Sequence, residues 1–314
     1  MNIMENFYSI YKKNGFAISK PLLDQDSIKK LRSNLDEELQ DHQGGVILGI
    51  EKIKNQNLLK KIVEIFSSST IIDIVGNFEN SINKDIFLLP KFQVHKNYHV
   101  NLKEFHGWHR DCSGEMSYKY CKNILFNKKY FFSKIGIYLQ KNGEFGGSID
   151  IIKNSHENFS KIKTVFRKLK GIPLKIIILV HKYFNNLYLK VPEKIFMFFL
   201  NAKKLYPNEG SAVFFDSRII HRGSPISKKK INDVNYVKGQ YHARLPSNKD
   251  KFTLYCQVGT SEAVDSYFFD RLKRENNSEE LDVWIEQINI IRKIDNKFAD
   301  KINFILNPII KKYK

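Results

Sequence analysis

Three residues could bind a metal ion: His109 and Asp111, which are two positions apart, and His221 far downstream. Residues i and i+2 of a β-strand point to the same face, so this imidazole and carboxylate would project together. A second imidazole from another strand would complete a set of two histidines and one carboxylate. That set holds Fe(II) on one face and leaves the opposite positions open. The same letters also fit an ordinary surface pair of His109 and Asp111, with His221 as a buried structural histidine.

Short strands are the elements that would position these side chains. From about residue 86, runs rich in β-branched and aromatic residues alternate with turn signals, which is typical of strands. No strand–helix–strand rhythm separates them, which favours an antiparallel barrel or jelly roll. His221 closes an apolar run, and a glycine follows two residues later at position 223, as expected where a strand leaves the core. The runs are IFLLPKFQVHKN, FHGWHRD, KIGIYLQ, SIDIIKNS, SAVFFDSRIIHRG and KFTLYCQVG.

Helices are expected on both sides of this β core. Residues 1–85 are mainly helical in pattern, with Asp24 or Asp26 as the N-cap of a helix over 27–40. Residues 261–314 are helical again, and Ser278 is a candidate helix start. We therefore predict an α+β protein with an all-β core over 86–260, helical flanks packed on the barrel, and a single functional domain overall.

An apolar and basic stretch, residues 157–205, interrupts the β pattern and predicts a helical insertion between two barrel strands. Three roles fit its composition. It could pack as a cap on the barrel, cover the site as a lid, or lie on a membrane surface as a basic amphipathic element.

Composition narrows the class of protein. The chain has 314 residues, 42% of them hydrophobic, which is enough for a substantial core. Its net charge of +19 comes mostly from lysines spread along the chain, so no nucleic-acid partner is expected, although an anionic or lipid-like substrate would suit such a surface. Three cysteines without a CxxC pair fit a reducing cytoplasm. Neither a secretory signal nor a membrane-spanning run is recognisable, so a cytoplasmic location is expected.

Taken in order, FHGWHRD, KIGIYLQKNGEFGGSIDIIKNSH and the segment from Gly210 to Ser224 closely resemble the phytanoyl-CoA dioxygenase family. The resemblance covers roughly residues 86–260. It implies a double-stranded β-helix (a jelly-roll, cupin-like fold) and an Fe(II)- and 2-oxoglutarate-dependent oxygenase that uses O₂. It also implies that His109, Asp111 and His221 are the iron ligands and catalytic centre. Related iron halogenases lack the carboxylate, so Asp111 favours hydroxylation.

The resemblance leaves the anchor of 2-oxoglutarate open. In the family, an arginine about ten residues after the distal histidine binds the far carboxylate, but the count from His221 reaches Asn232. The loop is lengthened, so Lys251 is the positional equivalent at the next strand. Arg244 is the better group chemically, because a guanidinium binds a carboxylate in a fork. Arg222 should point to the opposite face of its strand.

The leading functional prediction is hydroxylation of an unactivated C–H bond of a small-molecule, lipid or sugar-type substrate, with release of succinate and CO₂. A non-catalytic jelly-roll protein that binds a ligand is the first alternative. A protein that docks on membrane surfaces through residues 157–205 is the second.

Overall fold

The fold was analysed in a computed structural model of the chain. It describes residues 3–42, 46–96, 109–111, 130–140, 149–156, 201–224, 233–237, 240–244, 250–268 and 279–313.

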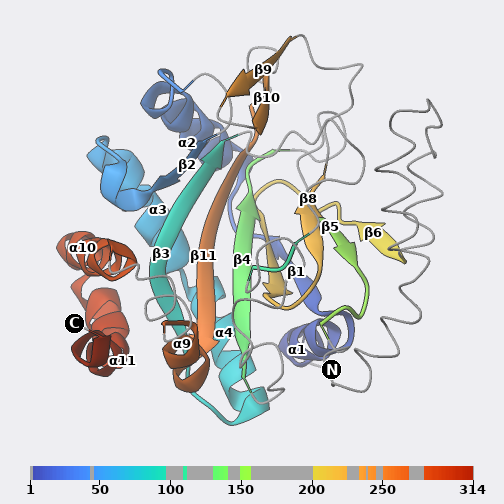
Figure 1. Ribbon diagram of the computed structural model, residues 1–314, viewed down its shortest axis with the longest axis vertical. Helices are drawn as coiled ribbons and strands as arrows, with labels where there is room; N and C mark the ends of the chain where they lie inside the picture. Colours follow the sequence, from blue (N-terminus) through green and yellow to red (C-terminus); the bar gives the residue numbers. More distant parts are fainter. Residues whose placement is uncertain are drawn as a thin grey trace.

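A six-stranded antiparallel sheet forms the centre of the molecule, with strand order β1-β7-β4-β11-β3-β2 (Figure 1). β-branched and aromatic residues make up nearly half of these strands, which suits a pleated surface buried on both faces. The strands are β1 (Phe16–Pro21), β2 (Val46–Gly49), β3 (Ile86–Lys96), β4 (Phe132–Tyr138), β7 (Ser211–Asp216) and β11 (Phe252–Thr260).

A smaller sheet has the order β6-β5-β8, and its strands are β5 (Ile149–Ile152), β6 (Ala202–Lys204) and β8 (His221–Gly223). An isolated bridge pairs His109 with His221 and so places residue 109 beside β8. The chain therefore passes between the sheets in a fixed order: β3, His109, β4, β5 and β6, β7, β8, β11. This alternation of two antiparallel sheets is a double-stranded β-helix, and it confirms the predicted fold class.

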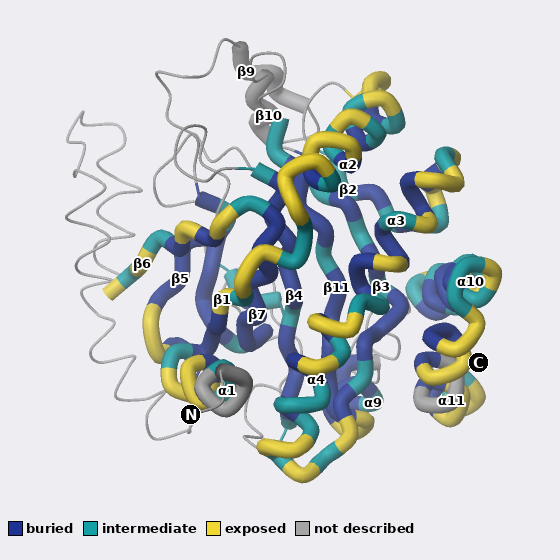
Figure 2. Tube along the Cα trace, turned by 180° about the vertical axis from the view of Figure 1, so that it is seen from behind, coloured by how far each residue is buried: buried dark blue, intermediate teal, exposed yellow. Residues whose placement is uncertain are grey.

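Two apolar clusters lie on the two faces of the large sheet. On one face, residues such as Ile135, Phe214 and Leu254 pack against the helices. On the other face, Tyr138, Val213 and Phe215 pack against Ile149 and Ile151 of the smaller sheet. Seen from behind, the central strands β4, β7 and β11 are mostly buried, whereas the helices expose their outer sides to solvent (Figure 2). The second face is the interior of the barrel, and the side chains of the candidate site project into it.

The helices form both flanks, as the sequence predicts. Asp24 caps α2, since its carboxylate accepts a hydrogen bond from Ser27 N at 2.8 Å, and this satisfies an otherwise unpaired helix N–H. The helices are α1 (Ile3–Asn14), α2 (Gln25–Glu38), η1 (Ile50–Lys52), α3 (Gln56–Phe66), α4 (Ser69–Ile82), α9 (Ser261–Phe268), α10 (Glu279–Ile294) and α11 (Asn296–Tyr313).

The N-terminal segment also contributes two strands that its mainly helical pattern does not predict. β1 pairs with β7 and β2 pairs with β3, so both extend the large sheet at its edges. Each is short, and each is stabilised by partners distant in sequence. Long-range pairing of this kind leaves only a weak local signal.

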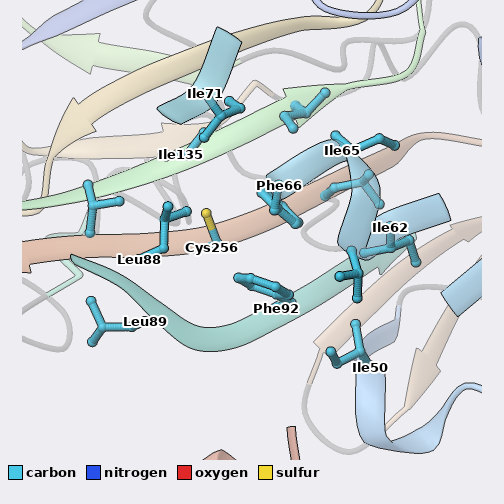
Figure 3. Close-up of a cluster of buried hydrophobic side chains, with 14 of the residues drawn as sticks. Ile50, Ile62, Ile65, Phe66, Ile71, Leu88, Leu89, Phe92, Ile135 and Cys256 are labelled. Carbon is cyan, nitrogen blue, oxygen red and sulfur yellow. The ribbon is translucent and has the colours of Figure 1, made fainter. Parts of the chain in front are cut away.

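Strand β3 bends at an irregularity that a helix stabilises. Tyr255 of β11 pairs with Gln93, yet Gln257 pairs with Leu89, so β3 contains extra residues, including Pro90, that form a bulge. The freed N–H of Phe92 donates to Gln287 Oε1 of α10 at 2.8 Å. Beside it, Phe92 stacks on Phe66 of α3 with ring centroids 4.6 Å apart (Figure 3).

Replacing Gln287 with leucine is expected to destabilise the fold by about 1–3 kcal/mol, because the buried N–H of Phe92 loses its acceptor. The free energy of unfolding from chemical denaturation measures this. Asn289→Leu on the exposed side of the same helix is the control, with an expected change within about 0.5 kcal/mol. Equal losses in the two variants would contradict this role of Gln287.

Several predicted features lie outside the described residues, including most of the 157–205 insertion, of which only 201–205 is described. A two-stranded hairpin of β9 (Asp233–Val237) and β10 (Gln240–Arg244) stands apart from both sheets. Within the described part of the chain, no helix combines the length and apolar character needed to cross a bilayer.

Candidate metal centre

The two histidines are brought together by their backbones. His109 N donates to His221 O at 2.9 Å, and His221 N donates to His109 O at the same distance. A pair of this kind fixes the two Cα atoms opposite each other, and the imidazole rings lie on one side with centroids 4.4 Å apart.

Asp111 completes the cluster from the turn that follows the bridge, rather than from a continuous strand. Its Oδ1 lies 3.8 Å from His109 Nε2 and 3.7 Å from His221 Nε2. One ligand atom from each of the three residues falls within 4.8 Å of the others. Distances of this size leave room between the three atoms for an ion bound to all of them.

The histidine from β8 is held in the form that binds metals. His221 Nδ1 lies 3.1 Å from Ile219 O, so the proton belongs on Nδ1 and the lone pair of Nε2 faces Asp111. Burial lowers the pKa of His221 to about 3, although the charge of Asp111 opposes this shift. The imidazole is therefore neutral near pH 7, as a metal ligand must be.

The carboxylate is ionised and incompletely satisfied. Burial alone would raise the pKa of Asp111, but Lys134 and the two histidines outweigh it and hold the pKa well below its usual value. Asp111 Oδ2 is buried and has no hydrogen-bond partner among the described residues. A buried charged oxygen without a partner is costly, and a bound cation would remove that cost. The donor set of two imidazole nitrogens and one carboxylate fits Fe(II).

Polar side chains from the large sheet face this cluster across the barrel interior. Lys134 of β4 reaches Asp111 Oδ1 with its Nζ at 3.4 Å. Directly opposite Lys134 in the sheet is Gln257, whose buried Oε1 has no partner in the described part of the chain. Two pairs further along, on the same face, Tyr255 lies opposite Gly136, and its hydroxyl is 3.3 Å from that of Tyr138.

On the outer face of the smaller sheet, a fully buried ion pair joins β5 to β8. Arg222 Nε donates to Asp150 Oδ2 at 2.9 Å, and Ser224 Oγ donates to Asp150 Oδ1 at 2.5 Å. Arg222 follows His221, so the two side chains leave opposite faces of the strand, as the sequence predicts. The pair stabilises the strand that carries His221.

The two predicted anchors of 2-oxoglutarate belong to later segments of the chain than β8. Lys251 immediately precedes β11. Burial lowers its pKa to about 7, and the neighbouring charge of Asp150 opposes this shift. Arg244 ends β10, where its backbone pairs with Asp233, and its side chain lies outside the described residues.

Lys134, Gln257 and Asp150 were not predicted as residues of the site region. A lysine in KIGIYLQ reads as the solvent-facing position of an alternating strand. Only the register with β11 places it inside the barrel. Its spacing gave one signal: Lys134 is four residues before Tyr138, so the two side chains lie on the same face of the strand.

No family model and no curated protein matched the chain. Several solved structures are similar to it. The non-heme alpha-ketoglutarate-dependent epimerase SnoN from nogalamycin biosynthesis is 11% identical, with 82% of this chain and 81% of that one covered and a TM-score of 0.43. AviO1 from Streptomyces viridochromogenes Tue57 is 11% identical, with 81% and 93% covered and a TM-score of 0.45. HygX from Streptomyces hygroscopicus, with nickel and 2-oxoglutarate bound, is 13% identical, with 81% and 86% covered and a TM-score of 0.46. The double-stranded β-helix is evident from the strand order of the two sheets and does not depend on these similarities.

Proposed function

We propose that this protein is an Fe(II)- and 2-oxoglutarate-dependent oxygenase that hydroxylates a C–H bond of a small-molecule, lipid or sugar-type substrate. The observation that carries the proposal is the cluster of His109, Asp111 and His221, with their ligand atoms within 4.8 Å of one another. The order of sequence motifs that resembles the phytanoyl-CoA dioxygenase family supports the same activity.

Each residue of the cluster has a distinct task. His109 and His221 would supply neutral nitrogen ligands, and the hydrogen bond from His221 Nδ1 to Ile219 O keeps that ring oriented. Asp111 would supply the negative charge that partly neutralises the ion. When bound, iron(II) together with 2-oxoglutarate and O₂ would supply the oxidising power for hydroxylation, with succinate and CO₂ as co-products.

Surrounding residues prepare the site for that chemistry. Phe215 packs against His221 with ring centroids 4.8 Å apart, and Ile151 pairs with it across the sheet. These apolar neighbours exclude water from one side of the cluster, which strengthens charge interactions inside it. The three ligands approach from one side, and the large sheet faces them with polar groups.

An anaerobic titration tests the proposal. Protein loaded with Fe(II) should develop a visible charge-transfer absorption band when 2-oxoglutarate is added, because the acid chelates the metal through its keto oxygen and adjacent carboxylate. His109→Ala should give no band. A folded wild-type protein that binds neither Fe(II) nor 2-oxoglutarate would favour a non-catalytic jelly-roll protein and contradict the proposal.

A further inference from the structure

A dicarboxylate co-substrate that chelates a metal through one end needs a partner for its far carboxylate. Burying an unpaired carboxylate in a barrel is costly, and a cation with additional hydrogen-bond donors removes that cost. The barrel interior beside the triad must therefore supply a positive charge.

Lys134 is a positive charge already at that place. Its Nζ lies 3.4 Å from Asp111 Oδ1 and 4.6 Å from the centre of the Tyr255 ring. The side chain is only 16% exposed, so its charge acts in a poorly solvated environment.

The neighbours of Lys134 form a polar row prepared for an oxygen-rich group. Gln257 pairs with Lys134 across the sheet, and its buried amide oxygen has no partner among the described residues. The amide can turn its nitrogen toward a ligand, since the two ends of a glutamine side chain are alternative donors and acceptors. Gly136 makes room for the Tyr255 ring, because a Cβ at this position would lie 2.6 Å from a ring carbon.

The alternative anchor, Lys251, is far from Gln257 along the chain. Gln257 pairs with Lys134, and Lys251 is six residues earlier on the same strand, which is about 20 Å at 3.3–3.4 Å per residue. The co-substrate has only four carbon–carbon bonds of about 1.5 Å each. The charge of Asp150 acts on Lys251, and the Asp150 side chain pairs with Arg222 on the outer face of the smaller sheet.

We propose that Lys134 of β4, with Gln257 of β11 beside it, binds the distal carboxylate of 2-oxoglutarate. This inference rests on the proposed function and assigns the anchor to a different strand from the one expected at sequence level. The lysine ammonium would give up its contact with Asp111 as that carboxylate ligates the metal, and would turn on its flexible stem to the incoming acid.

The test compares two acids of the same length on the Fe(II)-loaded protein without O₂. 2-Oxoglutarate carries the distal carboxylate, and 2-oxopentanoate has a methyl group in its place. In the wild type, the dissociation constants from the charge-transfer band should favour 2-oxoglutarate by roughly 10- to 100-fold, the usual worth of a charged hydrogen bond. In Lys134→Met this preference should fall to about 3-fold or less, while the affinity for 2-oxopentanoate stays close to that of the wild type.

Four further variants make the result specific. Lys153→Met removes an equal charge from an exposed turn and should keep the full preference. Lys251→Met and Arg244→Met test the alternative anchors, and loss of the preference in either, with retention in Lys134→Met, would overturn the proposal. If Lys134→Met does not fold, Lys134→Gln is measured in its place.

Two other outcomes separate the inference from the proposed function. If the loss of Lys134 weakens Fe(II) binding but leaves the preference between the acids intact, Lys134 orients Asp111 and does not anchor the acid. If the wild type forms no chelate with either acid, the proposed function itself fails.

Discussion

Asp111→Ala is expected to weaken Fe(II) binding by at least ~100-fold and to abolish turnover, because loss of a ligand should exceed the 10- to 100-fold cost of losing a residue that only orients one. Asp111 provides the one carboxylate of the cluster, and its Oδ2 is buried without a partner among the described residues. Removing it leaves two imidazoles beside the charge of Lys134, which repels a divalent cation. Isothermal titration of the metal-free protein measures the affinity.

The fold should survive this substitution, because Asp111 lies in a turn and belongs to neither of the two apolar clusters that hold the sheets and helices together. Asp265→Ala removes a carboxylate that pairs with Lys312 on the surface, and should leave metal affinity unchanged. Metal binding by Asp111→Ala that equals that of the wild type would show that the ion, if bound, is held elsewhere.

Asp150→Leu is expected to reduce the free energy of unfolding by about 3–5 kcal/mol, since it removes one partner of a fully buried ion pair. Arg222 Nε and Ser224 Oγ both donate to Asp150, so one substitution takes an acceptor from two buried groups. The pair joins β5 to β8 immediately next to His221. Chemical denaturation gives the loss of stability directly.

A surface pair serves as the matched control for this prediction. Glu64→Ala removes the partner of Lys60, which lies 4.0 Å away with both side chains largely in water, and should cost within about 0.5 kcal/mol. The double variant Asp150→Leu/Arg222→Met should be more stable than the sum of the two single losses predicts, because it leaves no buried charge from this pair. Additive losses would mean that the two side chains do not stabilise the fold as a pair.

The three metal ligands could be predicted from the sequence because the signals for them lie in short segments of the chain. His109 and Asp111 are close in the chain, and His221 follows an apolar run that predicts a strand. The structure divides this run into β7 and β8, and His221 begins β8 instead of ending a single strand. The structure brings these three side chains within 4.8 Å of one another, although Asp111 lies in a turn and not on the strand that the spacing predicts.

The rest of the site depends on register, which a single sequence does not reveal. Lys134 and Gln257 face each other only because β4 and β11 pair in one particular alignment. A slip of one residue in either strand would turn the side chain of that strand to the helical face. The partnership of Asp150 with Arg222 likewise follows from the pairing of β5 with β8 across 72 positions of sequence. Strands β1 and β2 were missed for the same reason, since their stabilising partners are remote.

The most direct test of the central claim is succinate formation by purified protein supplied with Fe(II), 2-oxoglutarate and O₂. The wild type should convert 2-oxoglutarate to succinate and CO₂ even without its prime substrate, at a slow uncoupled rate, whereas His109→Ala and Asp111→Ala should not. Succinate formation at the wild-type rate in both variants would contradict the assignment of these residues as the metal centre. Its absence in a wild-type protein that binds Fe(II) would contradict the proposed activity.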